Sequence, residues 1–328
     1  MIFFPAFFLQ GQNVRTIRID AANARPLNLS QIAETVTPVV LESPPERISN
    51  ICLTNEYIFI TSMSSVVQFD LSGKFAKSID CGGIVSANVT VDTVKRELYV
   101  PVGDKIQRYN YAGNLVREYS LNVTNIASCL FHNDTLWVIS WVVQPDKSAI
   151  YTTLKINPST NQLTTLPFEK KNMPLQAPSG GFVQIGLICL LTIYNEDVVV
   201  SFSNDPVVYG IQQDKVIPLV QWNINPQAKE VAEQIPLRAN GFTGEYLFIN
   251  FFRDSRYYVY MENMQTGAKY TANNIIDDIF HSSGDCIVKF VGKNGYFAFH
   301  KDRDAFTGNS VGGIPLKTGP VVFIVKTK

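Results

Sequence analysis

Asn55-Glu56-Tyr57-Ile58-Phe59-Ile60 is the stretch that decides the fold of this 328-residue chain, because its pattern is repeated. It joins a short turn holding an acidic residue to a strand rich in aromatic and β-branched residues, which favour β-structure. The same arrangement returns at residues 96–100, 133–138, 195–200 and 244–249. The recurrence predicts a fold built from one supersecondary unit used several times.

A second element follows most of these strands, in which another strand runs into a polar turn. It is found at residues 67–74, 107–114, 155–161 and 259–267. The Asn, Asp and Gly residues in these turns are those that hairpin turns require. A unit of roughly 40 to 60 residues with four short strands is typical of a propeller blade, which is stable only between neighbouring blades.

Five such units are visible, and the rest of the chain supplies most of a sixth. The five cover residues 48–80, 88–121, 125–167, 181–225 and 238–274, and strands of the sixth fall at 286–301 and 319–326. The sixth unit is one or two strands short, whereas residues 34–41 form an extra strand before the first unit. We therefore predict one all-β domain over residues 13–328, a six-bladed β-propeller whose N-terminal strand pairs with residues 321–326 and removes the open edges.

With these units in place, the chain resembles the secreted six-bladed β-propeller proteins of gut anaerobic bacteria, which are distantly similar to NHL-repeat propellers. The resemblance rests on the leader strand at 29–42, on residues 69–75 closing the first blade, and on the C-terminal strand at 319–326. Many relatives carry a Gly-Pro-Gly-Glu-type run after the first blade, where this chain has residues 80–85. The resemblance implies a fold more than a function, because most of that family has no assigned activity.

The N-terminal segment bears on the compartment. Residues 1–9 are apolar and contain four Phe, but they are too short to span a bilayer. Segment 1–12 is similar to the end of a signal peptide, with Gly11 and Gln12 near a cleavage point; the alternative is an apolar terminus packed on the domain. We expect export, to the periplasm or the cell surface of a gram-negative bacterium, without a transmembrane span.

The amino-acid composition limits the classes of binding partner and metal site that can be expected. The chain has 28 Lys and Arg against 28 Asp and Glu, so no basic field favours nucleic acid. The five Cys form no CxxC pair, which argues against a zinc site or a disulfide framework. Four of them lie in or beside apolar runs as small hydrophobic residues, and Cys81 is expected in a loop.

Motifs for known chemistry are missing from the sequence. The three His residues have no metal-ligand spacing, and His132 is expected to be a solvated turn residue. There is no nucleophile elbow, phosphate loop or dinucleotide fingerprint. We therefore assign no catalytic residue, no metal ligand and no cofactor. One enzymatic alternative stays open, a metal-dependent hydrolase or lactonase-like enzyme with a divalent ion such as calcium in the central channel.

Propeller geometry predicts where a ligand binds. If the strands of a blade are called A to D from the axis outward, the B-to-C and D-to-A connections share one face, and that face receives the long insertions. These are residues 140–148, 168–181, 224–237, 251–256 and 300–314. The candidate contacts combine aromatic and guanidinium groups: Trp141, Phe252, Arg253, Arg256, His300 and Arg303.

These side chains suit a glycan or a peptide, because aromatic faces stack on sugar rings and guanidinium groups hold carboxylates. The alternative is structural: the aromatic residues cap the blade cores, and the arginines pair with Asp254, Asp302 and Asp304. We expect an exported binding or scaffolding module without a covalent catalytic step.

Overall fold

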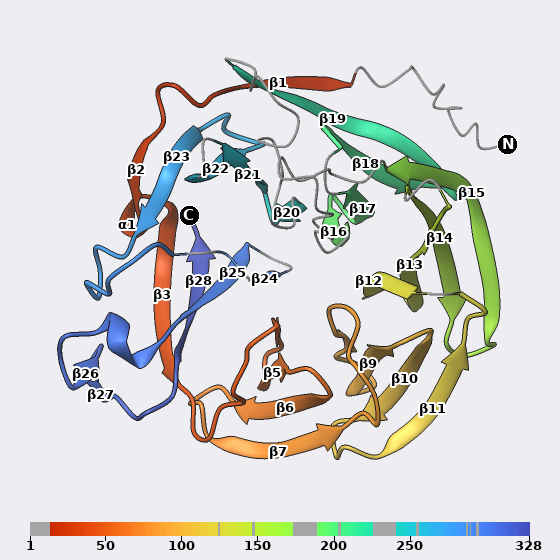
Figure 1. The fold of residues 1–328 in the computed structure, drawn as a ribbon, viewed down its shortest axis with the longest axis horizontal. Coiled ribbons are helices and arrows are strands. Elements are labelled where there is room, and N and C mark those ends of the chain that lie inside the picture. The colour runs from red at the N-terminus through yellow and green to blue at the C-terminus, as the bar shows by residue number, and fades with distance from the viewer. Residues whose placement is uncertain are drawn as a thin grey trace, which may run out of the picture.

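In a computed structural model of the chain, six sheets stand in a ring around a central axis, which confirms the six-bladed propeller (Figure 1). The structure describes residues 14–123, 125–145, 148–172, 189–202, 205–225, 241–253, 256–286, 288, 290–292 and 295–328. The predicted signal-peptide segment at 1–12 lies outside the described residues.

The blades are numbered here in chain order, and the strands of each are given from A to D. Blade 1 contains β4 (Asn50–Leu53), β5 (Tyr57–Thr61), β6 (Ser65–Asp70) and β7 (Phe75–Asp80). Blade 2 contains β8 (Thr90–Asp92), β9 (Glu97–Val102), β10 (Lys105–Asn110) and β11 (Leu115–Ser120). Blade 3 contains β12 (Asn125–His132), β13 (Thr135–Val143), β14 (Ala149–Asn157) and β15 (Gln162–Asn172).

The other three blades follow the same order. Blade 4 contains β16 (Cys189–Tyr194), β17 (Asp197–Phe202), β18 (Val207–Gln212) and β19 (Lys215–Asn225). Blade 5 contains β20 (Gly241–Thr243), β21 (Tyr246–Arg253), β22 (Arg256–Asn263) and β23 (Lys269–Ile276). Blade 6 contains β24 (Phe290–Val291), β25 (Tyr296–Lys301), β28 (Val321–Thr327) and β3 (Ala33–Val40). Between β25 and β28 lie the short helix η2 (Arg303–Ala305) and the hairpin of β26 (Ser310–Val311) and β27 (Ile314–Pro315).

The ring closes as predicted, with the N-terminal strand β3 as the outermost strand of blade 6. It runs antiparallel to β28, and Val40 lies opposite Val321. The chain then continues from β3 into β4 of blade 1. The pairing of β3 with β28 therefore fixes the N-terminal part of the chain to its C-terminal part. Because β3 covers the free edge of β28, blade 6 is complete.

Two strands before β3 were not predicted. β1 (Arg15–Asp20) runs parallel to β19 on the outside of blade 4, and β2 (Arg25–Asn28) runs parallel to β23 on the outside of blade 5. The four-residue helix α1 (Leu29–Ile32) joins β2 to β3. In Figure 1, β1, β2 and β3 follow one another along the perimeter of the ring, on the outside of blades 4, 5 and 6.

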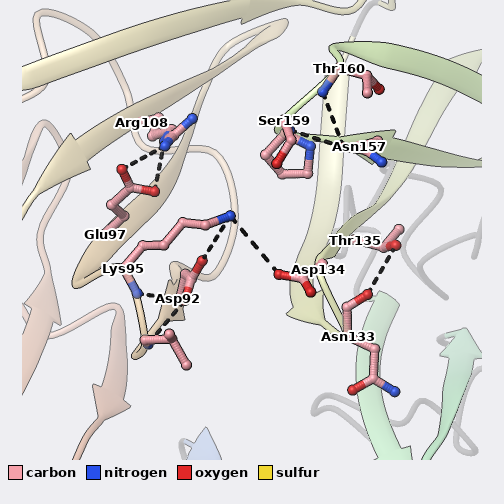
Figure 2. Close-up of polar contacts among 12 residues, drawn as sticks. Asp92, Lys95, Glu97, Arg108, Asn133, Asp134, Thr135, Asn157, Ser159 and Thr160 are labelled. Atoms are coloured by element: carbon pink, nitrogen blue, oxygen red, sulfur yellow. Dashed lines mark hydrogen bonds and ion pairs between the residues drawn. The ribbon is translucent and has the colours of Figure 1, made fainter.

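The turn chemistry read from the sequence is present in four blades. The last residue of strand C is Asp70, Asn110, Asn157 or Asn263, and its side-chain oxygen accepts backbone N–H groups of the turn that follows. Figure 2 shows Asn157 with Ser159 and Thr160. These bonds replace the strand ladder where the chain reverses.

The apolar core lies between the blades. Tyr99 of blade 2 stacks on Phe131 of blade 3, with 5.3 Å between ring centroids. Tyr194 of blade 4 stacks in the same way on Phe242 of blade 5, at 4.2 Å. Each blade therefore completes the core of the next, which is why a single unit cannot be stable alone.

Hydroxyl groups connect the inner strands of successive blades. Ser128 of blade 3 accepts the backbone N–H of Leu191 in blade 4 at 3.2 Å. Thr192 of blade 4 accepts that of Phe242 in blade 5 at 3.2 Å. These N–H groups belong to the free inner edges of the sheets, so each hydroxyl satisfies a buried donor that no strand can reach.

Replacing Thr192 by valine should therefore lower the free energy of unfolding by about 1 to 3 kcal/mol, because the buried N–H of Phe242 loses its acceptor while the side-chain shape is kept. Urea denaturation measures the change. Thr135→Val is the matched control, since its hydroxyl only contacts the carbonyl of Asn133 in an exposed turn. Equal stability of the two variants would contradict a role for the hydroxyl in joining blades 4 and 5.

Candidate binding face

The face formed by the B-to-C and D-to-A connections, called here the loop-rich face, is raised at blades 3 and 5. Strands β13 and β14 each have 9 residues and β21 and β22 each have 8, against 5 for β5 in blade 1. Parts of the insertions predicted at 140–148 and 251–256 are thus strand, namely residues 140–143, 251–253 and 256, because cross-strand pairing continues into them. At about 3.3 Å per residue, the extra length projects on the order of 10 Å.

Trp141 lies in the extended part of β13. It pairs across the sheet with Tyr151 of β14 and is half-buried. Its ring is on the same side of the strand as Trp137 and Ile139, and it packs on the apolar cluster between blades 3 and 4. The blade 3 and blade 4 boundary therefore holds the predicted aromatic contact.

Four further aromatic rings gather beside it. Together with Trp141 they form what we call the aromatic patch, which consists of Trp141, Tyr151, Phe168, Phe202 and Tyr209. Phe168 of β15 lies 5.4 Å from the ring of Tyr209 in β18 and 6.2 Å from that of Phe202 in β17. Tyr151 lies 5.0 Å from Phe202. Trp141, Phe168 and Tyr209 are half-buried, while Tyr151 and Phe202 are buried beneath them.

A carboxylate orients one of these rings. The hydroxyl of Tyr209 donates to Asp205 at 3.0 Å, and the other oxygen of Asp205 accepts the backbone N–H of Val207 at 3.2 Å. Asp205 is itself buried, in the B-to-C connection of blade 4. The ring of Tyr209 is thus held at both ends, by the carboxylate and by Phe168, and its orientation is set before any ligand arrives.

The predicted contacts in blade 5 are described only by their backbone. Phe252 and Arg253 end β21, Arg256 begins β22, and Arg253 lies opposite Arg256 in the hairpin. Their side chains lie outside the described residues. The neighbouring Phe251 is fully buried and stacks on Tyr258 at 5.2 Å, so this aromatic residue does cap a blade core.

Two loops at blade 6 form a rigid pair, residues 277–286 and 302–309. The buried carboxylate of Asp277 accepts N–H groups of Ile279, Phe280 and Ser282. The buried ammonium of Lys301 donates to the carbonyls of Ser283, Gly284 and Asp285 at 2.9, 2.6 and 2.8 Å. A backbone bond from Ser283 to Ala305 joins the loops.

His300 and Arg303 belong to this part of the face. His300 is half-buried near the end of β25, opposite Val322. Arg303 donates to the carbonyl of Phe306 at 3.0 Å and to the side chain of Asn309 at 3.2 Å. Those partners are not the Asp302 and Asp304 that the structural alternative named, because the turn of η2 directs the guanidinium along its own loop. Arg303 therefore stabilises the loop.

The six predicted residues share one face but fall on three blades. Trp141 is in blade 3, Phe252, Arg253 and Arg256 are in blade 5, and His300 and Arg303 are in blade 6. The structure adds Phe168, Tyr209 and Asp205, which sequence reasoning missed. The only sequence signal was the aromatic content of the strands, since the residues of the aromatic patch come from five strands in two blades and meet only in the folded ring.

The opposite face is made of the A-to-B and C-to-D turns. Charged side chains in these turns form ion pairs between neighbouring blades. Glu56 of blade 1 pairs with Arg96 of blade 2 at 2.9 Å. Lys95 reaches Asp92 at 3.8 Å and Asp134 of blade 3 at 3.9 Å, as Figure 2 shows. The repeated acidic turn residue thus contributes ion pairs between neighbouring blades at Glu56 and Asp134, which connect blades 1, 2 and 3.

The expectation for His132 was wrong. Its side chain is buried, and Nε2 lies 2.9 Å from the carbonyl oxygen of Glu196 in blade 4. The residue precedes the turn Asn133-Asp134 but points toward the neighbouring blade, because it is the last residue of β12 and side chains alternate along a strand. His132 is a contact between blades 3 and 4.

The cysteines are free and buried in the structure. Burial raises the pKa of the Cys81 thiol to about 11 and that of Cys286 to about 12, so neither is a thiolate near neutral pH. Cys81 follows β7 in a loop, as expected, but it is not exposed. Within the described part of the chain, no three His, Cys, Asp or Glu side chains are grouped to hold a metal ion.

The ring of six sheets and its raised face define a six-bladed β-propeller with a candidate binding surface at one mouth, a form consistent with a binding or scaffolding module. The chain belongs to the DUF4934 family, which is described as a domain of unknown function and matches residues 14–306. No curated protein matches the sequence. Among the described residues, no helix has the length and apolar character to cross a membrane.

Two solved structures share the fold. A Bacteroides fragilis protein provisionally described as exported superposes with a TM-score of 0.68 at 14% identity, over 95% of this chain and 99% of its own. A member of the DUF4221 family from Bacteroides vulgatus superposes with a TM-score of 0.55 at 11% identity, over 90% and 97%. With the family match, they confirm the resemblance to propellers of gut anaerobes.

Proposed function

We propose that this protein is an exported binding module that holds a glycan against the aromatic patch. The observation that carries the proposal is the grouping of three half-buried rings, Trp141, Phe168 and Tyr209, where the raised end of blade 3 meets blade 4. Partly exposed aromatic faces stack on the C–H face of sugar rings, and a rigid ring of sheets positions them at little entropic cost. A peptide is the other ligand class for this face.

Export is supported by the sequence and by one relative. Residues 1–9 have the apolar composition of a signal peptide, and the Bacteroides fragilis protein of the same fold is described provisionally as exported. We place the protein in the periplasm or at the cell surface. Fractionation of the native host with an antibody to the folded domain tests this, and a cytoplasmic location would contradict it.

Ligand screening followed by substitution tests the site. A glycan array and a peptide array are probed with the purified protein, and the best ligand is titrated by calorimetry. Trp141→Ala and Phe168→Ala should each weaken binding about 10- to 100-fold, because truncating a central aromatic contact costs roughly 1.4 to 3 kcal/mol. Leu163→Ala is the matched control, since Leu163 is 42% exposed on the same blade and lies at the other end of β15.

Three outcomes are informative. Selective loss in the two aromatic variants, with cooperative unfolding kept, supports the patch. Unchanged affinity in both would remove the patch as the site, and selection of peptides alone would replace the glycan by a peptide. Arg253→Ala, assayed in the same series, tests the predicted guanidinium contact of blade 5. Within the described residues no observation favours the metal-dependent hydrolase, so it is not proposed.

A further inference from the structure

β1 occupies the outside of blade 4 as an added strand. Blade 4 already has the four strands β16 to β19, the number that makes a complete blade in blades 1, 2 and 3. Among the described strands β1 pairs with β19 alone, in parallel register from Arg15 opposite Val220 to Asp20 opposite Asn225. It is therefore bound to a finished sheet through a free edge, as a peptide is in β-strand addition.

The side chains of β1 divide into two sets. Ile17 and Ile19 are buried, 4% and 0% exposed, in the apolar cluster that includes Trp222 of β19 and Tyr258 of β22. The alternating residues Thr16, Arg18 and Asp20 are exposed to solvent. Two β-branched residues, spaced two apart, thus supply the apolar contact and set the register.

A buried acid provides a third point of recognition. The guanidinium of Arg15 bonds to the carboxylate of Glu262 in β22, whose side chain is only 6% exposed. The other oxygen of Glu262 accepts the hydroxyl of Tyr260 at 2.6 Å. Among the described residues, Arg15 is the cation paired with Glu262, so removing β1 leaves a buried carboxylate without its cation.

We propose that the outer edge of blade 4 is a peptide-binding site, filled in this structure by the chain's own β1. Its occupant in a complex is an extended segment of a partner protein with a basic residue followed at the second and fourth positions by β-branched residues. The open edge of β19, the apolar cluster and Glu262 each recognise one property of that segment. This site is separate from the aromatic patch.

Because β1 is covalently connected to the domain, a partner peptide can occupy the site only when β1 is undocked. A tethered strand competes at an effective concentration of about 1 mM, so a free peptide binds well only after β1 is released. The connection at 21–24 is suited to experimental release, because Ala22 and Asn23 are exposed. The carboxylate of Asp20 accepts the backbone N–H groups of Ala22 and Asn23 and the side-chain amide of Asn23, and the guanidinium of Arg25 donates to the carbonyl of Ala24.

The experiment uses the whole chain with a specific protease site inserted between Ala22 and Asn23. After cleavage, a fluorescein-labelled peptide of residues 14–20 is titrated by fluorescence anisotropy. We expect saturable binding to the cleaved protein and at least tenfold weaker binding to the uncleaved one. A peptide with Arg15→Gln should bind about tenfold more weakly, and one with Ile17→Ser and Ile19→Ser should not bind.

A variant of the protein distinguishes specific recognition of Arg15 from nonspecific binding of the peptide. In the Glu262→Gln protein, the preference for the peptide with Arg15 over the peptide with Arg15→Gln should fall to less than threefold. Nonspecific binding would leave this preference unchanged. If cleavage abolishes cooperative unfolding, the uncleaved chain with Ile17→Ser and Ile19→Ser takes its place, because it weakens the docking of β1 without cutting it. The proposal is overturned if the peptide binds neither the cleaved protein nor the uncleaved serine variant. It is also overturned if the peptide with Ile17→Ser and Ile19→Ser binds as well as the natural peptide. The aromatic patch is assayed apart, so either result leaves the proposed function standing.

Discussion

Replacing Gly73 by alanine is expected to lower the free energy of unfolding by about 3 to 5 kcal/mol, because among the described glycines an added Cβ makes its closest approach to another atom here. Gly73 has φ +86° in the C-to-D turn of blade 1, and an added Cβ would lie 2.3 Å from the carbonyl oxygen of Val40. That oxygen belongs to the last residue of β3, and the N–H of Glu42, two residues further on, donates to the carbonyl of Gly73 at 2.8 Å. The methyl group would therefore push the closing strand away from blade 1.

The chain offers a matched control for this prediction. Gly267 is in the C-to-D turn of blade 5 with φ +74°, and an added Cβ would meet nothing within 4 Å. Gly267→Ala should cost about 1 kcal/mol, which is the backbone strain alone. Urea denaturation of both variants gives the difference. Similar losses in the two would mean that the contact between blade 1 and the closing strand is unimportant to the ring.

Replacing Lys301 by methionine is expected to cost about 3 kcal/mol, because three carbonyls of residues 283–285 lose a charged donor at once and the stem is kept. The ammonium is buried between β25 and the loop at 277–286. That loop carries part of the loop-rich face, so hydrogen exchange of its amides should rise far more than exchange in blades 1 to 3.

The control is a second lysine, which is exposed to solvent and has a single ion-pair partner. Lys105 pairs with Glu118 at 2.7 Å on an exposed part of blade 2, and Lys105→Met should leave the free energy of unfolding nearly unchanged, because exposed ion pairs contribute little. If Lys301→Met unfolds at the same urea concentration as Lys105→Met, with unchanged exchange at 277–286, the three carbonyl bonds do not order the loop.

Much of the architecture could be predicted because its signals are local. The turn residue at the end of strand C, Asp70, Asn110, Asn157 or Asn263, is adjacent in sequence to the N–H groups that it binds. The missing strand of blade 6 followed from counting strands, since a sheet edge must be covered. The prediction of β3 against β28 needed no knowledge of side-chain contacts.

The candidate site could be predicted only to the level of a face. Trp141 and Arg303 were correctly expected on the side of the B-to-C connections, because strand order alone decides that side. The bonds of Arg303 to Phe306 and Asn309 depend on the turn of η2, which has no clear sequence signal. The buried position of His132 depends on the neighbouring Glu196, in a different blade.

By itself, then, the sequence determined the strands and turns of the blades and the number of blades, since these depend on residues close together in the chain. The mode of closure followed from the strand count, because the free edge of the last blade must be covered. Tertiary structure alone decided the aromatic patch and the docking of β1. Ile17 lies opposite Trp222, more than half the chain away, and Phe168 meets Tyr209 of the next blade. Such contacts depend on the angle and spacing of blades in the ring, which arise from the packing of all six blades together.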